Sequence, residues 1–247
     1  MNALSTLIIV ILLGLASFFY TMAGFAGGST FTAILLLIGI SAGQSALGGL
    51  LFNVVSASSS IFRWRTHFSR GFAWFIIGSV PAAFLAGLFV LPEALLKIVM
   101  GVAITAGGVS LIVITFPLGH IVLKWPFKIL IGIVIGAVAG LTGIGGGVYL
   151  APVLILGGMA KPKTTAATTT VFILLNSLSG IVARIPRLGS LILSTPVFLL
   201  SIPVLFVSAQ LGSHFGSERL SQISVKRTIG LVLISVGAYL TLSAFIH

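Results

Sequence analysis

Two glycine clusters are the first candidates for a binding site. They read Gly24-Phe-Ala-Gly-Gly-Ser29 and Gly140-Leu-Thr-Gly-Ile-Gly-Gly-Gly147, and each one ends an apolar segment and begins a short one. A helix that starts in such a cluster directs its first N–H groups and a positive dipole end at the space before it, and glycine lets an anion approach the backbone. The alternative is close packing between helices. On the first interpretation, the binding residues are Gly24, Gly27, Gly28, Ser29, Gly143, Gly145, Gly146 and Gly147.

Polar residues inside the third apolar segment of each half are the second candidates. In the first half, Asn53 shares a helical face with Ala46, Gly49, Ser56 and Ser60. In the second half, the corresponding face carries Thr165, Thr169, Phe172, Asn176 and Ser179. An amide inside a bilayer needs a partner, and hydroxyls line wet cavities. We therefore add Asn53, Thr165, Thr169 and Asn176 to the predicted substrate site, with hydrogen bonding between helices as the alternative of equal weight.

Side chains that titrate are missing from the middle of the apolar segments. Glu93 and Glu218 are the only carboxylates, the chain has no cysteine, and its four histidines lie near loops or segment ends. No set of residues suits a catalytic reaction, a metal ion or a cofactor, so we expect a protein that is not an enzyme. A polar, uncharged site beside helix N-termini favours a small anion as the ligand.

The composition indicates that membrane-spanning helices position these residues. Hydrophobic residues make up 58% of the 247 residues and charged residues only 6%, whereas soluble domains carry about 25% charged residues. Most apolar segments approach the ~20 residues that a crossing needs, and two, Ser29–Ile40 and Val148–Leu156, are too short. The net charge of +11 comes from basic residues in short loops, which favours contact with the lipid bilayer over binding of nucleic acid.

The two halves resemble copies of one unit. Ala23-Gly24 matches Ala139-Gly140, 116 positions later, and Lys97…Gly101…Gly108 matches Lys226…Gly230…Gly237, 129 positions later. We predict an all-α polytopic membrane protein with two repeats of five segments, residues 1–118 and 119–247, in which the second segment of each repeat is a short half-helix after a glycine-rich break. If all segments cross, ten basic residues lie on one side and three on the other, which favours inverted repeats and an N-terminus outside the cytoplasm.

The second-half motif resembles the TauE/SafE family of membrane permeases, also called the sulfite exporter or toluene-sulfonate uptake permease family. The resemblance rests on Gly140–Gly147, Ala151-Pro152-Val153-Leu154, Lys161–Ala166 and Val171-Phe172…Asn176-Ser177, with a degenerate echo at Gly24–Ser29 and Phe52-Asn53. It implies a secondary transporter that moves sulfite, sulfonates or related anions across the cytoplasmic (inner) membrane. A passive anion channel and a non-transporting membrane assembly protein are the alternatives. The expected partners are the small anionic substrate and the lipid bilayer, and a homodimer stays open.

Overall fold

A computed structural model describes residues 3–89, 91–113, 120–185, 197–218 and 222–245. All the regular elements within these ranges are helices. Two short 3₁₀ turns, η1 (Arg65–His67) and η2 (Arg70–Phe72), join two of the longer helices. The longer elements are α1 (Ala3–Met22), α2 (Gly28–Leu37), α3 (Ala42–Trp64), α4 (Ala73–Leu88), α5 (Glu93–Val113), α6 (Trp125–Thr142), α7 (Gly147–Leu156), α8 (Pro162–Val182), α10 (Val197–Glu218) and α11 (Gln222–Ser243). The predicted all-α class is therefore confirmed.

Six of the helices in the described ranges are long and apolar enough to cross a membrane: α1, α3, α4, α6, α8 and α10. The two segments predicted to be short are also confirmed. Helices α2 and α7 have ten residues each, which is about 15 Å of helix, half of a hydrocarbon core of about 30 Å. The beginning of the predicted segment Leu191–Leu211 lies outside the described residues up to position 196.

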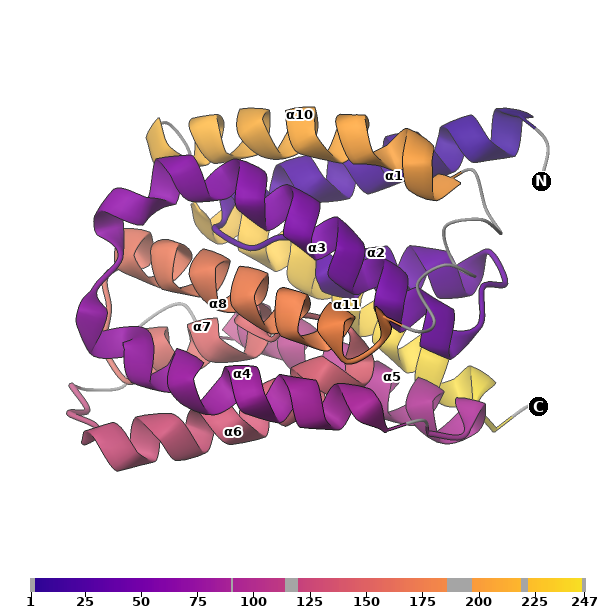
Figure 1. Ribbon diagram of the computed structural model, residues 1–247. Coiled ribbons are helices and arrows are strands. Elements are labelled where there is room, and N and C mark those ends of the chain that lie inside the picture. The colour runs from indigo at the N-terminus through magenta and orange to yellow at the C-terminus, as the bar shows by residue number, and fades with distance from the viewer. Residues whose placement is uncertain (1–2, 90, 114–119, 186–196, 219–221, 246–247) are drawn as a thin grey trace.

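Helices from the first half pack side by side with helices from the second half. Figure 1 shows α10 along α1 at one edge of the bundle, α4 along α6 at the opposite edge, and α3 beside α8 between them. Helix α11 packs against α5. The chain therefore forms one interlocked bundle, in which each half contributes to every main helix pair.

Glycines set the close approach of α4 and α6. Gly132, Gly136 and Gly140 of α6 each face a backbone carbonyl of α4, at Phe75, Ser79 and Ala83 respectively, so closely that a Cβ atom has no room. Both series rise by four residues, so the two helices run parallel. Without a hydrophobic driving force between helices in lipid, such close backbone contact is a main source of association. Gly140 therefore has a packing role.

Helices α5 and α11 meet through a reciprocal pair of glycine contacts. Gly101 lies against the carbonyl of Gly237, and Gly230 lies against the carbonyl of Gly108. The partners run in opposite directions along the chain, so α5 and α11 are antiparallel. The same four glycines match each other in the sequence at an offset of 129 positions. Gly101 matches Gly230, and Gly108 matches Gly237. Under this match, the contact of Gly101 with Gly237 and the contact of Gly230 with Gly108 are equivalent.

Large apolar side chains cover the outer face of the bundle. On α1, Leu7, Ile11 and Leu15 are each at least half exposed, and comparable residues follow the outer faces of α6 and α10. A surface of this kind is stable in a hydrocarbon solvent and unstable in water. The polar side chains Asn53, Thr169 and Asn176, in contrast, are buried inside the bundle.

Candidate functional site

Helices α1 and α6 both stop close to a glycine in the left-handed conformation. Gly24 has φ of +79°, and Gly143, the C-cap of α6, has φ of +75°. Residues other than glycine pay a steric cost there, because the Cβ atom meets the following carbonyl. Gly24 and Gly143 are 119 positions apart. The sequence match pairs Gly24 with Gly140 instead, at an offset of 116 positions, so the equivalent glycine in the structure lies three residues later.

Helices α2 and α7 begin directly after a second left-handed glycine. Gly27 precedes α2 with φ of +105°, and Gly146 precedes α7 with φ of +80°. Neither helix has a side-chain cap at its N-terminus, and neither has an acidic residue in its first turn. The first N–H groups of a helix have no acceptor within the helix. Both glycine clusters thus present uncapped positive helix ends inside the bundle, as predicted.

Asn53, in the middle of α3, joins the two clusters. Its Nδ2 donates a hydrogen bond to the carbonyl oxygen of Ile144, at 3.2 Å. A Cβ atom on Gly145 would lie 2.7 Å from the same Nδ2, and Gly28, the first residue of α2, is packed against the Asn53 side chain and the Ile144 carbonyl. The start of α2, the middle of α3 and the second glycine break therefore meet at one point.

Thr169 of α8 makes a corresponding connection from the second half. Its hydroxyl donates to the carbonyl of Gly24 at 2.8 Å, and also to the carbonyl of Thr165 one turn earlier. The Thr169 Cβ lies 3.5 Å from the position that a Cβ on Gly147 would take. Thr169 therefore contacts the first break and the start of α7 together, much as Asn53 contacts Ile144 and the start of α2.

Both breaks are sealed by backbone contact with the opposite half. Gly24 packs on the backbone of Ala166 near the start of α8, and Gly143 packs on the backbone of Ala46 near the start of α3. The buried indole of Trp64 packs on Ala166 as well. These contacts leave no space for a side chain at either glycine, so each break is packed directly on a helix of the opposite half.

Several buried polar atoms around the breaks have no hydrogen-bond partner. Buried polar groups normally have one, and an orphaned group marks a place for water or a ligand. The atoms are Asn53 Oδ1, Ser177 Oγ, Thr165 Oγ1, Thr32 Oγ1, Tyr149 Oη and Asn176 Oδ1. The surrounding side chains are apolar, and include Phe25, Ile144, Val148 and Ile173. In the described part of the chain, no group of three acidic or histidine residues could hold a metal ion.

The structure brings together most of the predicted site residues and leaves two apart. Gly27, Gly28, Gly145, Gly146 and Gly147 surround the helix starts, with Asn53 and Thr169 against them. The Ser29 hydroxyl instead contacts Tyr20 Oη at 3.1 Å. The Asn176 amide donates to the carbonyl of Phe172, one turn earlier on its own helix. Thr165 is buried and its hydroxyl has no partner.

Two residues near the breaks were missed in the sequence. Ser177 has its Oγ 3.1 Å from the Cβ position of Gly145, although its neighbour Asn176 was selected. Arg184 follows an apolar segment and is expected in a loop, yet only 5% of its surface is exposed and it donates to the carbonyls of Gly180, Gly140 and Leu141. Its position was a usable signal, because Asn176, Gly180 and Arg184 follow one another every four residues on one helical face.

Comparison with known proteins gives matches that span nearly the whole chain. The family model described as Sulfite exporter TauE/SafE matches residues 8–240. "Probable membrane transporter protein y4hK" of Sinorhizobium fredii (strain NBRC 101917 / NGR234) is 28% identical over 234 residues, covering 88% of this chain and 91% of that protein. "Probable membrane transporter protein YjnA" of Bacillus subtilis (strain 168) is 27% identical over 240 residues, covering 86% and 93%. No solved structure matches the chain.

Proposed function

Because the chain belongs to the sulfite exporter TauE/SafE family of multi-pass membrane proteins, we propose that it is a secondary transporter of small oxyanions, with sulfite and sulfonates as the substrate class. The anion binds between the starts of α2 and α7, where N–H groups of the first helical turns and the Asn53 amide coordinate it. Thr165, Thr169 and Ser177 supply hydroxyls at the edge of the same site. No cofactor, metal ion or covalent step is needed for this activity.

One observation carries the proposal: two uncapped helix starts, contributed by different halves of the chain, converge on a buried amide. Asn53 contacts Gly28 of the first break and Ile144 of the second break. Helix N-termini stabilise negative charge, and burial strengthens that interaction because water does not screen it. The site needs no buried cation at its centre.

Alternating access follows from the way in which the two breaks are held. We propose that residues 1–118 and 119–247 are inverted repeats that rock against each other, so that the Gly24–Ala166 and Gly143–Ala46 contacts open in turn. The reciprocal contacts of Gly101, Gly108, Gly230 and Gly237 support this two-fold relationship. A passive channel needs a continuous path, and the two sealed breaks favour a transporter instead.

The orientation and location of the protein are part of the same proposal. We propose that the protein lies in the cytoplasmic membrane with its N-terminus outside the cytoplasm, and the distribution of basic loop residues supports this orientation. On this orientation, Lys124 and Lys161 lie on the cytoplasmic side, and the turn at Ser41 lies on the outer side. A homodimer is compatible with the exposed apolar faces of α1 and α6.

Reconstituted protein provides the test. Proteoliposomes that contain the protein should take up radiolabelled sulfite saturably, and unlabelled sulfonates should compete, whereas choline should not. A non-transporting assembly protein would show no saturable flux. A channel would show flux that does not saturate and that substrate on the opposite side does not accelerate.

A further inference from the structure

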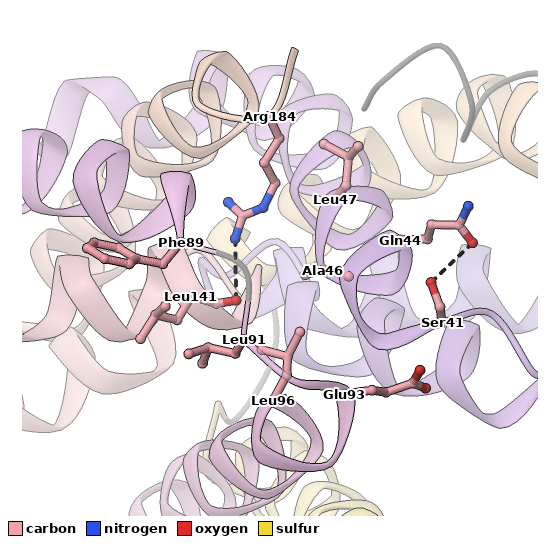
Figure 2. A pocket seen from close by; sticks show the side chains of 11 residues that line it. Ser41, Gln44, Ala46, Leu47, Phe89, Leu91, Glu93, Leu96, Leu141 and Arg184 are labelled. Atoms are coloured by element: carbon pink, nitrogen blue, oxygen red, sulfur yellow. Dashed lines mark hydrogen bonds between the residues drawn. The ribbon is translucent and has the colours of Figure 1, made fainter. Parts of the chain in front are cut away.

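A pocket lies close to the end of α6. It has a volume of about 330 Å³ and is formed by the beginning of α3, the α4–α5 connection, the beginning of α5 and the ends of α6 and α8. Figure 2 shows the Arg184 side chain on one side of the pocket, directed at the end of α6, and Ser41 on the other side, where its hydroxyl donates to Gln44 Oε1 at 3.3 Å. Leu47, Leu91 and Leu96 supply apolar wall.

We propose that this pocket is an oxyanion-capture site in which Arg184 is the charged ligand, while Ser41 and Gln44 form a polar part of the opposite wall. The pocket would concentrate the anion before it reaches the paired helix starts, and this role rests on the proposed function. The ligand class is a small oxyanion with a planar or tetrahedral head, such as a sulfonate, sulfate or sulfite.

Arg184 is held in position rather than left on a flexible stem. Its Nη1 donates to Gly180 at 3.2 Å, and its Nη2 donates to Gly140 and Leu141, at the end of α6. These carbonyls carry the negative end of the α6 dipole, so they stabilise the guanidinium in a nearly buried place. The guanidinium is thereby kept at the pocket wall, and its planar fork suits two oxygens of one ligand.

Arg184 and Glu93 are the charged residues on the pocket wall. Glu93 is the acidic residue on its wall, but Glu93 is 55% exposed in its side chain and pairs with Lys97 at 3.3 Å. Water and Lys97 therefore reduce its repulsion of an anion. Helix α3 begins at this pocket with no acidic residue in its first turn, so its dipole adds a further positive contribution.

The position of the pocket connects it to the second glycine break. Ala46 lines the pocket and also forms the seal with Gly143. Leu141, two residues before Gly143, lines the pocket and accepts from Arg184. An anion on Arg184 competes with the Gly140 and Leu141 carbonyls for the same N–H groups. Binding therefore loosens the end of α6 just where the path to Asn53 must open.

The natural absence of cysteine permits a test by thiol labelling. In purified protein in nanodiscs, a Gln44→Cys variant is labelled with a negatively charged and a positively charged methanethiosulfonate reagent, and the ratio of the two rates is measured. Arg184→Gln in the same background should lower the ratio of anionic to cationic labelling by on the order of tenfold, the effect of removing one nearby unit charge. Arg184→Lys should preserve most of the ratio, and Glu93→Gln should raise it.

Protection from labelling by a bound ligand is a second measurement, and it can be made in protein that retains Arg184. Sulfate should slow the labelling of Gln44→Cys compared with chloride at equal ionic strength, and it should lose this effect in Arg184→Gln. An unchanged rate ratio in Arg184→Gln, or no protection by sulfate with Arg184 present, would overturn the proposal. A protein that shows both effects but transports no sulfur oxyanion would refute the proposed function and leave this site standing.

Discussion

Asn53 and Ile144 are 91 residues apart in the chain, and the side-chain amide of the first donates to the carbonyl of the second at 3.2 Å. The bond joins the middle of α3 to the glycine break that precedes α7. Because Gly28 also packs on the Asn53 side chain, one amide holds the two half-helix starts in register. The proposed substrate site is built on this junction.

Replacing Asn53 should therefore be more damaging than replacing Asn176. Asn53→Ala leaves the buried Ile144 carbonyl without its donor, at a cost of about 1–3 kcal/mol, and removes a proposed ligand of the anion. Asn176→Ala affects only a bond within α8. We expect sulfite uptake to fall at least tenfold in Asn53→Ala and to stay within about threefold of the parent in Asn176→Ala. Equal losses in both variants would argue against Asn53 as the junction.

Substitutions in the second break should abolish transport without removing the folded protein from the membrane. Gly145 has φ of +81° and Gly146 has φ of +80°, so Gly145→Leu or Gly146→Leu adds strain of about 1–2 kcal/mol as well as bulk at the helix start. Gly71→Leu is the matched control, because a Cβ atom on Gly71 would meet only the Ser69 hydroxyl, at 3.9 Å. Size-exclusion profiles report folding and uptake reports activity. Normal flux in the break variants would exclude this loop from the site.

Thr169 should matter more than its neighbour Thr168. The Thr169 hydroxyl donates to Gly24 in the first break, whereas the Thr168 hydroxyl donates only to Thr164 in its own helix. Thr169→Val should lower the stability by about 1 kcal/mol and reduce uptake, while Thr168→Val should change neither strongly. Thermal unfolding of the purified variants and initial uptake rates measure the two effects. Indistinguishable variants would mean that the Gly24 contact is dispensable.

The inverted-repeat proposal makes a prediction about two equivalent turns. Ser41 follows α2 and Lys161 follows α7, and both are exposed. In cells that carry Ser41→Cys or Lys161→Cys in this cysteine-free chain, a membrane-impermeant thiol reagent added outside should label only the Ser41→Cys variant. In inside-out vesicles the pattern should reverse. Labelling of both turns from one side would indicate parallel repeats and refute the inverted arrangement.

The helices and their breaks were predictable because they follow from local chemistry. The long apolar runs predict spanning helices, and glycine clusters before two short runs predict half-helices. The register between the repeats was three residues off at the breaks, because the second cluster is rich enough in glycine to allow several matches. The left-handed φ of Gly143 shows which of these glycines corresponds to Gly24. Tertiary contacts such as the bond of Asn53 to Ile144 cannot be predicted from the local spacing of residues.

Arg184 shows a different limit of the sequence. A single arginine near the end of an apolar segment is usually an interfacial charge, and only the fold brings the α6 carbonyls and the α3 start around it. Asn176 shows the reverse, since its type and position indicated a ligand and its amide is used within its own helix. Residue type and periodicity predict which residues share one face of a helix, but they do not predict which other helix packs against that face.

Counterflow of radiolabelled sulfite in proteoliposomes tests the central claim most directly. The vesicles are preloaded with unlabelled sulfite, a sulfonate, a carboxylate or chloride, and labelled sulfite is added outside. A transporter that alternates access around an oxyanion site should accumulate label transiently when sulfite or the sulfonate is inside, and not when chloride is inside. If folded protein accumulates no label under any of these conditions, the proposed oxyanion transport is contradicted.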